Sequence, residues 1–446
     1  MRIDLPDKVK FILDTLLNAG YDAYAVGGCV RDSILGREPD DWDITTSALP
    51  EQVKTLFRRT IDTGIQHGTV TIMLEKEGFE VTTYRIDGEY QDSRHPSEVI
   101  FTPNLVEDLK RRDFTINAMA YNEKTGIVDE FHGMNDLEQK VIRAVGNPEE
   151  RFTEDALRIM RAIRFSAQLG YSIEENTRKA ITKLAPTLRN ISAERIQVEL
   201  VKLITSDHPF WLKDAYTSGV TKVILPELDE MMETVQHNPH HQYTVGEHVL
   251  HSLEYVEKDK VLRLAMLLHD VGKPSRKTTD DNGVDHFYHH AAAGEEIAKK
   301  ILRRLKFDND TIYKVTKIVY FHDYKVELTP RGVRRAMAKI GEDIFPYLFP
   351  VKRADVLAQS MYQRQEKLDD LAKLQQLYEK ECKAGSCVSL KTLAVTGRDL
   401  IDAGFQPGPE LGGILQDLLK IVIDDPACNT RETLLRQAKH LLTLTT

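Results

Sequence analysis

The feature that most constrains how this chain can fold is a change in hydrophobic periodicity near residue 145. Before that point, short segments rich in β-branched residues, such as GTVTIML (68–74) and FEVTTYR (79–85), show the pattern of half-buried strands. Beyond it, apolar residues recur at the three- and four-residue spacing of helices, as in AERIQVELVKLI (193–204). The sequence therefore predicts an α/β N-terminal domain followed by all-α domains.

The 446-residue length is sufficient for several domains, and the sequence indicates where they divide. The polar, turn-rich segment QHNPHHQYTVGEH, which starts at residue 236, marks one boundary. We expect an α/β head, a first helical region, a histidine-rich helical domain and a helical C-terminal body, with the bounds 1–145, 146–235, 236–345 and 346–446.

Composition narrows the class of protein. The net charge of −9 excludes a globally basic nucleic-acid binder, so contact with nucleic acid must come from local basic patches. The four cysteines form no CxxC pair and are too few for a disulfide framework, which favours a reduced, cytoplasmic protein. The N-terminal segment carries charges throughout, and 18 apolar residues never follow one another, so we expect neither a signal peptide nor contact with a membrane.

Two aspartates, Asp41 and Asp43, stand on either side of Trp42 in the segment DDWDITT. If this segment is a strand, both carboxylates lie on one face, and Trp42 and Ile44 point the other way, into a core. Neighbouring carboxylates repel each other unless a cation lies between them, and oxygen ligands at this spacing suit Mg²⁺. A polar strand end is the simpler explanation for an isolated pair of this kind.

The residues around the two aspartates favour the metal site. Gly27 and Gly28 fall between a predicted strand and a predicted helix, where free backbone N–H groups can hold a phosphate. Arg31 follows in the first helical turn. Glu80 could bring a third carboxylate from a neighbouring strand, although it could equally be an ordinary surface residue. This combination indicates Mg²⁺-dependent phosphoryl transfer.

These motifs resemble those of the class II tRNA nucleotidyltransferases and bacterial poly(A) polymerases, members of the polymerase-β-like superfamily. The resemblance implies a polymerase-β-like catalytic head in which Asp41, Asp43 and Glu80 are the catalytic carboxylates. It covers residues 20–205 and extends more weakly to the C-terminus, as in LAVTGRDLIDAGFQPGPELGGILQDLL (393–419). The similar segments in the first half are VGGCVRDSILGREPDDWDIT (26–45), EDLKRRDFTINAMAYN (107–122), IVDEFHGMNDLEQKVIRAVGNPEERFTEDALRIMRAIRF (127–165) and ISAERIQVELVKLI (191–204).

The segment TEDALRIMR (153–161) contains residues suited to reading a nucleobase. On a predicted helix, Asp155 and Arg158 share a face. A carboxylate beside a guanidinium can pair with cytosine or adenine, since each offers an amino donor next to a ring acceptor, whereas uracil and guanine present a carbonyl to the carboxylate. The resemblance implies selection of CTP and ATP by these side chains, with Glu154 holding Arg158 and Arg161 contacting the triphosphate. An ordinary surface ion pair is the alternative.

The segment RRDFTINA adds further candidates for nucleotide binding. Arg111 and Arg112 supply positive charge for phosphates. Asp113 and Asn117, four residues apart on one predicted helical face, could hold the ribose. Helix capping and salt bridges are the alternative roles for these four residues.

Two segments bear on which nucleotides are added. Residues 84–101 are polar and turn-rich, which is typical of a mobile loop. In the family such a loop is linked to switching from C to A addition, so its presence argues against an enzyme that adds only the two C residues. Arg94-His95 stands where the family usually has two arginines, and FHGM (131–134) replaces its usual paired glycines.

Histidines and aspartates form a second set of candidates in the helical part of the chain. LLHDVGK (267–273) places His269 and Asp270 at the end of an apolar helix, where burial is unfavourable without a metal or hydrogen bonds. The order of the residues resembles an HD-type metal-dependent phosphohydrolase, in which a divalent ion such as Mg²⁺, Mn²⁺ or Ni²⁺ activates water. A retained fold without activity, used for helix packing and RNA contact, is the alternative. The expected ligands are His248, His269 and Asp270, with His290, His322 and Asp323 competing for the remaining positions.

The C-terminal third offers two features that suit contact with the tRNA backbone. A basic stretch has helical spacing, although a solvated helix face explains it equally well. Gly408-Pro409 opens a predicted helix whose free N–H groups could take a phosphate. The basic stretch consists of Arg331, Arg334, Arg335 and Lys339.

Together these features predict a tRNA nucleotidyltransferase that adds CCA from CTP and ATP, acting as a monomer or a homodimer. The terminal hydroxyl of tRNA attacks the α-phosphate, and pyrophosphate leaves. An A-only adding enzyme or a poly(A) polymerase on the same scaffold is one alternative. The other is an HD-domain hydrolase acting on RNA ends or nucleotides, whose head serves RNA binding.

Overall fold

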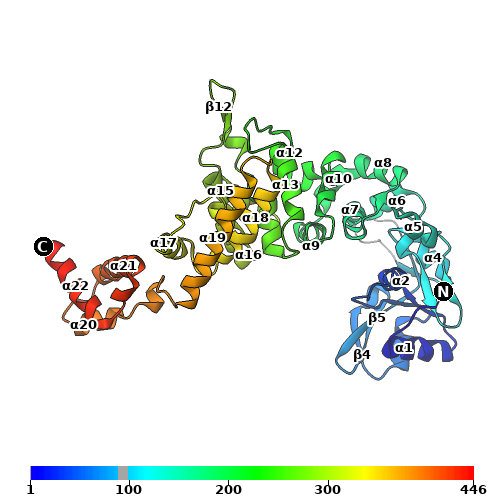
Figure 1. Cartoon of the computed structure of the whole chain (residues 1–446). Coiled ribbons are helices and arrows are strands. Elements are labelled where there is room, and N and C mark those ends of the chain that lie inside the picture. The colour runs from blue at the N-terminus through cyan, green and yellow to red at the C-terminus, as the bar shows by residue number, and fades with distance from the viewer. Residues whose placement is uncertain (1, 89–98, 446) are drawn as a thin grey trace. The chain divides into compact units, whose positions relative to one another are not determined.

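The structure is a computed structural model that describes residues 2–88 and 99–445 (Figure 1). It divides into two compact units, unit 1 (Met1–Asp229) and unit 2 (Glu230–Thr446). The division lies close to the boundary expected after residue 235, whereas the expected boundaries after residues 145 and 345 remain predictions. Within the described ranges, none of the helices combines the length and the apolarity that crossing a bilayer requires.

The N-terminal part of unit 1, called the head below, is built on a mixed sheet in the order β3-β4-β5-β2-β1-β8-β9 (Figure 1). Strand β1 pairs antiparallel with β2 and β8, and the central strand β2 pairs parallel with β5. The predicted α/β head is therefore confirmed. The strand bounds are β1 Ala23–Val26, β2 Ile44–Thr46, β3 Thr60–Gly64, β4 Thr69–Leu74, β5 Glu77–Thr83, β8 Ala120–Asn122 and β9 Gly126–Val128.

Strand β1 lies in the interior of the sheet, between β2 and β8. All four of its residues are buried, as expected for a strand covered on both faces. Helix α1 (Asp7–Asn18) packs on β1 and buries Val9, Ile12, Leu13 and Leu16, which share one helical face. Helix α2 (Gly28–Ile34) begins directly after the strand. This short connection places the glycine turn at the edge of the site described below.

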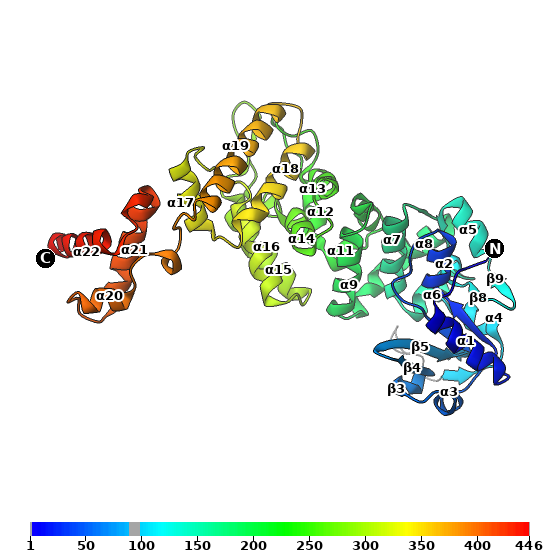
Figure 2. The same ribbon diagram turned by 60° about the horizontal axis from the view of Figure 1, so that its bottom comes forward.

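The rest of unit 1 is mainly helical and includes one short parallel pair, β10 (Val141–Ile142) with β11 (Ser172–Ile173). The helices pack in pairs, α6 with α8 and α7 with α9 (Figure 2). Helix α7 is the most buried of these, and Ile159, Met160 and Ile163 lie in its core-facing side. The bounds are α3 Pro50–Leu56, α4 Leu105–Lys110, α5 Gly133–Gln139, α6 Pro148–Glu154, α7 Leu157–Leu169, α8 Glu175–Leu184, α9 Ala193–Ile204, α10 Leu212–Thr217, α11 Thr221–Ile224 and α12 Pro226–Glu233.

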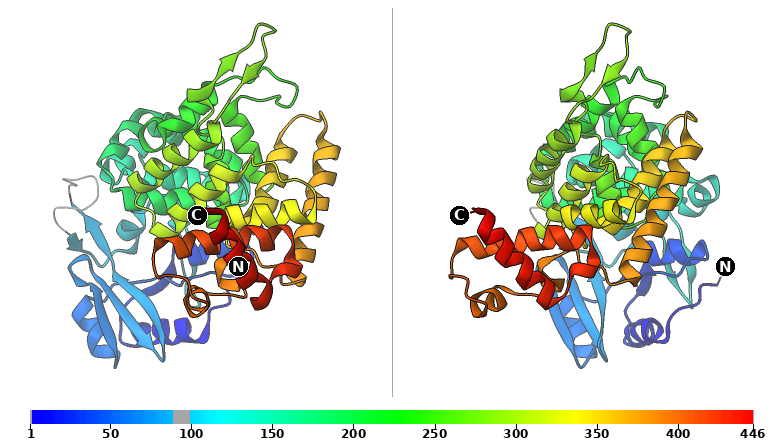
Figure 3. Two further views of the ribbon diagram at one scale, coloured as in Figure 1. Left: turned by 90° about the vertical axis from the view of Figure 1, so that its left-hand side faces the viewer. Right: turned by 60° about the vertical axis from the view of Figure 1, so that its left-hand side comes forward.

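Unit 2 is helical apart from one short hairpin. Helix α14 is buried along almost its whole length, and α13, α16 and α18 pack against it. The hairpin of β12 (Thr278–Thr279) and β13 (Asp285–His286) projects from these helices (Figure 3). The helices of this part are α13 Val245–Glu254, α14 Lys260–Leu268, α15 His290–Arg304, α16 Asn309–Phe321, α17 Pro330–Ile340, α18 Leu348–Ala358 and α19 Arg364–Lys383.

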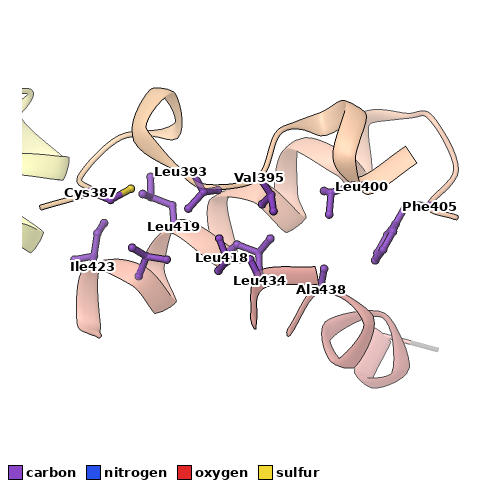
Figure 4. Packing of buried hydrophobic residues seen from close by; sticks show 11 residues of the cluster. Cys387, Leu393, Val395, Leu400, Phe405, Leu418, Leu419, Ile423, Leu434 and Ala438 are labelled. Atoms are coloured by element: carbon purple, nitrogen blue, oxygen red, sulfur yellow. The ribbon is translucent and has the colours of Figure 1, made fainter. Parts of the chain in front are cut away.

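The C-terminal helices α20 (Gly397–Asp402), α21 (Pro409–Asp424) and α22 (Arg431–Thr445) have a core of their own. Figure 4 shows Leu400, Leu418, Leu434 and their neighbours facing one another between the three helices. As predicted, Gly408-Pro409 opens a helix, because Pro409 is the first residue of α21.

The basic stretch of α17 is largely occupied by partners within unit 2. Arg331 and Arg335 both pair with Asp424 at the end of α21. Arg334 is buried and bonds to Glu381 and to the carbonyl of Ile423. These arginines join α17 to α19 and α21, while Arg331, Arg335 and Lys339 remain exposed on the helix surface. Contact of this stretch with tRNA stays a prediction.

Candidate active site and histidine cluster

The two aspartates of the DxD motif lie in an extended segment directly before β2. The predicted strand begins only at Ile44, so the expectation that Asp41 and Asp43 lie within it is wrong. Ile44 is buried and anchors the segment in the core. Trp42 is only half-buried and lines a surface hollow beside Phe79, so its predicted place in the core is also wrong. The chain emerges from the sheet here, and both carboxylates are solvent-accessible.

Strand pairing brings Glu80 towards the aspartates. Ile44 of β2 lies opposite Val81 of β5 in a parallel register, so the preceding residues Asp43 and Glu80 are also neighbours. Loss of hydration raises the pKa of Asp43, Arg112 opposes this shift, and Asp41 adds to it. Desolvation, Asp43 and Asp41 likewise raise the pKa of Glu80. The three carboxylates therefore repel one another.

This excess of negative charge fits a bound divalent cation. Oxygen ligands and incomplete neutralisation are what Mg²⁺ requires. The three carboxylates are not a fully assembled ligand set, however. Within the described part of the chain, the groups of three potential ligands whose atoms lie within 4.8 Å of one another are all in unit 2.

The glycine turn sits next to these carboxylates. Gly27 has φ 85° and ψ −131°, a left-handed conformation that residues with a Cβ rarely adopt. The backbone N–H of Val26 donates to the carbonyl of Asp43 at 3.0 Å, which ties the turn to the aspartates. A Cβ on Gly27 would lie 3.4 Å from the guanidinium of Arg112. Phosphate binding by Gly27 and Gly28 stays a prediction.

A hydrogen-bonded chain of polar side chains crosses the base of this site. Arg31 donates from Nη1 to Asn117 Oδ1 at 2.6 Å, and Asn117 Nδ2 donates to Asp113 Oδ1 at 3.1 Å. Arg161 Nε then donates to Asp113 Oδ2 at 2.7 Å. Although burial opposes ionisation of Asp113, the charge of Arg161 and the Asn117 amide lower its pKa to about 2. Asp113 is therefore an anion that fixes Arg161.

Asp113 and Asn117 meet in a different way from the one predicted. Only Thr115–Asn117 forms a helical turn, which is of the 3₁₀ type, and Asp113 precedes it. The common α-helical face expected for RRDFTINA is therefore wrong. An isolated bridge between Phe114 and Ala144 holds this segment in an extended form up to the turn.

Arg111 and Arg112 share one buried partner, Asp108. Arg111 donates to Asp108 Oδ1 at 2.9 and 2.7 Å, and Arg112 donates to Oδ2 at 3.3 Å. Although burial opposes it, the two guanidinium groups lower the pKa of Asp108. Arg112 also lies against Gly27 and acts on Asp43. Of the two arginines, Arg112 is thus the one that the structure places at the carboxylates.

The predicted single helix through TEDALRIMR is wrong, because the chain breaks at Asp155. Helix α6 ends at Glu154, and Asp155 is extended with φ −138° and ψ 103°. Its carboxylate accepts the N–H of Leu157 at 3.0 Å and so starts α7, as aspartate often does at a helix N-terminus. The Asp155 side chain therefore projects from a junction between two helices.

Asp155 and Arg158 are each held by a partner. Arg158 forms an ion pair with Glu154 at 2.7 Å, as the resemblance implies, and it also donates to the carbonyls of Arg151 and Arg111. Asp155 receives two bonds from Arg195 of α9, at 2.8 and 3.3 Å. Sequence reasoning missed Arg195. The signal was its presence in the ISAERIQVELVKLI segment, but its partner lies 40 residues away.

Two neighbouring residues of α7 were also missed. Arg164 is buried and bonds to Glu199 at 2.5 Å. The ring of Phe165 lies against the guanidinium groups of Arg31, Arg161 and Arg164. Nothing in the apolar periodicity distinguished Phe165 from an ordinary core residue.

The segments linked to the choice of nucleotide are described in part. The ends of the predicted mobile loop pair as β6 (Arg85–Asp87) and β7 (Val99–Phe101). Arg94-His95 lies outside the described residues. In FHGM, His132 adopts a left-handed φ of 62°, which explains why a glycine would suit this position. Gly133 is itself required, since a Cβ there would lie 2.4 Å from the carbonyl oxygen of Thr115.

Unit 2 brings the predicted histidines together in a largely buried cluster, called the histidine cluster below, in which only His290 is partly exposed. The cluster consists of His248, His269, Asp270, His290 and His322. Asp270 lies at its centre. One carboxylate oxygen is 3.3 Å from His269 Nε2 and 3.7 Å from His248 Nε2. The other is 3.6 Å from the Nε2 atoms of both His290 and His322. The carboxylate thus stands between two histidine pairs.

The imidazole rings are oriented as metal ligands usually are. The Nδ1 atoms of His269, His290 and His322 lie 2.7–2.8 Å from backbone carbonyl oxygens. This orients each ring so that its Nε2 faces Asp270 and is the atom that a metal could bind. Nitrogen and carboxylate donors of this kind suit Mn²⁺, Ni²⁺ or Zn²⁺. The residues therefore fit a divalent metal.

The structure favours His290 and His322 over Asp323 as ligands, and it places one further carboxylate beside the cluster. Asp323 is exposed and belongs to neither of the two potential ligand groups among the described residues, whereas His290 and His322 do. Asp355 of α18 has a carboxylate oxygen 2.9 Å from His248 Nε2 and 3.8 Å from His269 Nε2. A lone aspartate in the helical segment VKRADVLAQS carries no signal of this role.

Comparisons with known proteins show which families the chain resembles. Three family models match the chain. The poly A polymerase head domain matches residues 23–143, and the probable RNA and SrmB-binding site of polymerase A matches residues 170–232. The putative tRNA nucleotidyltransferase domain 2 matches residues 278–438. The CCA-adding enzyme of Levilactobacillus brevis is 39% identical over 437 residues, which are 96% of this chain and 97% of that protein. The enzyme of Lactobacillus helveticus is 37% identical over 98% of each chain.

Comparison with solved structures shows the same similarity. The chain resembles the crystal structure of the Bacillus stearothermophilus CCA-adding enzyme in complex with CTP, with a TM-score of 0.73, 29% identity, and coverage of 98% of this chain and 97% of that one. It also shares the fold of the Thermotoga maritima CCA-adding enzyme complexed with tRNA, with a TM-score of 0.59, 20% identity, and coverage of 99% and 100%.

Proposed function

The chain belongs to the CCA-adding enzymes, a family of class II tRNA nucleotidyltransferases related to poly(A) polymerases, and we propose that it adds CCA to the 3′ end of tRNA from CTP and ATP. The observation that carries this proposal is the assembly of three elements in unit 1. Incompletely neutralised carboxylates lie beside a glycine turn and Arg112, and the fixed side chains of Asp155 and Arg158 lie at the start of α7, which also carries Arg161.

Each element has a role in the transfer reaction. The terminal tRNA hydroxyl attacks the α-phosphate of the nucleotide, a new P–O bond forms, and pyrophosphate leaves. Asp41, Asp43 and Glu80 would hold Mg²⁺, which neutralises charge on the phosphates. The chain's own arginines, Arg31, Arg112 and Arg161, bind the triphosphate, and Asp113 and Asn117 orient the ribose.

The pair Asp155 and Arg158 would select the base without a template. Arg195 fixes the Asp155 carboxylate, whose oxygens retain lone pairs that can accept an amino proton. Glu154 and two backbone carbonyls hold Arg158 so that it can donate to the ring acceptor. Uracil or guanine would turn a carbonyl towards the carboxylate, and the lost bond discriminates strongly.

Single-nucleotide assays test this proposal. A tRNA transcript that ends before CCA is incubated with each nucleoside triphosphate alone and then with CTP and ATP together. We expect two additions from CTP, one subsequent addition from ATP, and negligible use of UTP and GTP. An A-only enzyme would leave this transcript unchanged with CTP, a poly(A) polymerase would add long A tracts, and ready UTP incorporation would contradict base selection by Asp155 and Arg158.

We also propose that the histidine cluster is a divalent metal centre with phosphohydrolase activity. The observation in its favour is the position of Asp270, whose two oxygens face separate histidine pairs while Asp355 faces one of them. Such ligands would hold metal that lowers the pKa of a bound water for attack on a phosphate ester. RNA ends and nucleotides are the expected substrate class.

Hydrolysis of bis(p-nitrophenyl) phosphate with Mn²⁺ or Ni²⁺ tests the second proposal. We expect metal-dependent release of nitrophenol that is lost in Asp270→Asn and kept in Asp323→Asn. Tight metal binding without hydrolysis of this ester or of nucleotides would assign the cluster to stabilising unit 2. If the protein showed no metal binding and no hydrolysis, the proposed metal centre itself would be contradicted.

A further inference from the structure

One aromatic side chain in unit 1 is surrounded by positive charge. Phe165 of α7 is 6% exposed, and three guanidinium carbons lie close to the centroid of its ring, at 3.9 Å for Arg164, 5.0 Å for Arg31 and 5.4 Å for Arg161. Arg31 comes from α2 in the head, and the other two come from α7 itself. A single ring therefore gathers cations from two elements that are far apart in the sequence.

We propose that Phe165 is a positioning residue that holds Arg31 and Arg161 for the triphosphate of the incoming nucleotide. This inference rests on the proposed function, because it takes the nucleotide site of unit 1 as given. The electron-rich face of an aromatic ring attracts a guanidinium group, most strongly where water is excluded. Phe165 would contact no substrate and would act only through the arginines.

A ring is suited to this task because of where guanidinium donors point. The N–H groups lie in the plane of the guanidinium, whereas stacking on an aromatic ring uses its face. A carboxylate partner occupies N–H donors and competes with phosphate for them. In the structure Asp32 and Asn117 occupy donors of Arg31, Asp113 occupies a donor of Arg161, and Glu199 and Gln168 occupy donors of Arg164. The contact with the ring uses none of these donors.

The crowding of the cations shows why such a partner is needed. Burial lowers the pKa of Arg164, Glu199 opposes this shift, and the neighbouring Arg161 adds to it. Arg31 is likewise buried beneath the glycine turn. Without a nucleotide, the ring and the carboxylates together hold three like charges in one place. When a triphosphate binds, its oxygens replace part of the carboxylate contacts, and the ring contact persists.

The simpler role for Phe165 is apolar packing. Its ring also meets Phe114 edge-on, with centroids 5.8 Å apart and an interplanar angle of 80°. The chain offers a matched control in Phe57, which is 7% exposed and meets Phe11 edge-on at 6.4 Å and 77°. The two phenylalanines share burial and an aromatic partner, and the three arginines distinguish Phe165.

The first experiment compares Phe165→Leu with Phe57→Leu in the full chain. Because the triphosphate is common to both substrates and is bound before and during transfer, we expect KM for CTP and for ATP to rise in parallel, by about tenfold, with kcat retained. The preference among CTP, ATP and UTP should not change, since Asp155 and Arg158 are untouched. Phe57→Leu should leave both KM values at the parental level.

A second experiment changes the ring's electrons and keeps its shape. Phenylalanines carrying one, two or three fluorines are introduced at position 165, which weakens the attraction for cations with little change in packing. We expect KM for both nucleotides to rise with each fluorine. This series remains informative if Phe165→Leu does not fold.

The outcomes distinguish a failure of the inference about Phe165 from a failure of the proposed function. If the parent adds nucleotides and KM is constant across the fluorinated series, Phe165 is only a packing residue and the inference is overturned. An altered ratio of CTP to ATP use would also overturn it, because a triphosphate effect cannot distinguish bases. If the parent adds no nucleotide to tRNA, the proposed function itself fails.

Discussion

Asp43 in unit 1 directly precedes strand β2 and Asp270 in unit 2 directly follows the end of helix α14, and the charges around the two residues differ. Asp43 is solvent-accessible and faces Asp41 and Glu80, and its pKa is raised. Asp270 is buried among four imidazoles and Lys273, whose Nζ lies 2.7 Å away; although burial opposes ionisation, the pKa of Asp270 lies well below its ordinary value.

This difference shows two ways of preparing carboxylates for a cation. In unit 2 the protein itself supplies the counter-charge and fixes each ring, so the ligand geometry exists in advance. In unit 1 the carboxylates repel one another, and their charge is balanced only when a metal and a nucleotide are present. An open, incompletely neutralised site suits an enzyme that must admit a tRNA end together with a nucleotide and its metal.

The strongest test of this comparison removes the carboxylates of unit 1. The double variant Asp41→Ala, Asp43→Ala should lower kcat/KM for CTP addition by at least about a thousandfold, because several kcal/mol of metal-mediated charge stabilisation are lost. Mn²⁺ binding by the histidine cluster should be unchanged. Asp40→Ala, at an exposed neighbour, is the control. Addition within tenfold of the parental rate would show that the transfer site lies elsewhere.

The next test removes the central carboxylate of unit 2. Asp270→Asn should reduce Mn²⁺ affinity by at least about a hundredfold, since it is the residue that faces both histidine pairs. Calorimetric titration in the Asp41→Ala, Asp43→Ala background keeps the carboxylates of unit 1 from contributing.

Asp323→Asn is the matched control, because it also follows a histidine but is exposed and outside the cluster. Equal losses in both variants would mean that the cluster is not the binding site. Thermal melting of each variant shows whether a lost affinity reflects unfolding, and CTP addition should be the same in both.

We expect a smaller effect from removing Arg195, the residue that holds Asp155 of the base-reading pair. Arg195→Gln removes both charged bonds to Asp155, so the carboxylate is no longer held in one orientation. Discrimination between CTP and UTP, measured as the ratio of kcat/KM values, should fall by about tenfold. Arg178→Gln, which breaks a comparable pair with Asp214 on α10, should leave the ratio unchanged. If Arg195→Gln left the ratio of kcat/KM for CTP and UTP unchanged, the held orientation of Asp155 would not contribute to discrimination, and Arg158 alone would read the base.

The smallest effect concerns stability. A raised carboxyl pKa means that ionised Asp43 destabilises the folded state at a pH above that pKa, and this effect disappears as the pH falls towards the ordinary value of 3.8. Asp43→Asn should therefore raise the melting temperature at pH 7, without divalent ions, by on the order of 1–3 °C. The gain should vanish near pH 3.5 and reverse when Mg²⁺ is added. Asp40→Asn serves as the control, and equal shifts in both variants would argue against repulsion at the site.

Local patterns predicted a large part of this molecule. β-branched segments identified strands of the head, and apolar spacing identified the helices, because both depend on residues close together in the chain. The Glu154–Arg158 pair and the meeting of four histidines with Asp270 also follow from local sequence and family resemblance. The helix through Asp155 was wrong, since the competing capping bond to Leu157 is invisible to periodicity.

The sequence by itself determined the kinds of chemistry present: exposed carboxylates beside a glycine turn, and histidines at the ends of apolar helices. Only the tertiary structure decided the partners, such as Arg195 for Asp155, Asp355 for His248, and Phe165 for the arginines of two elements. The reason is physical. Secondary structure responds to neighbours in the chain, whereas the contact that a charged or aromatic side chain makes depends on which helices and strands pack beside it.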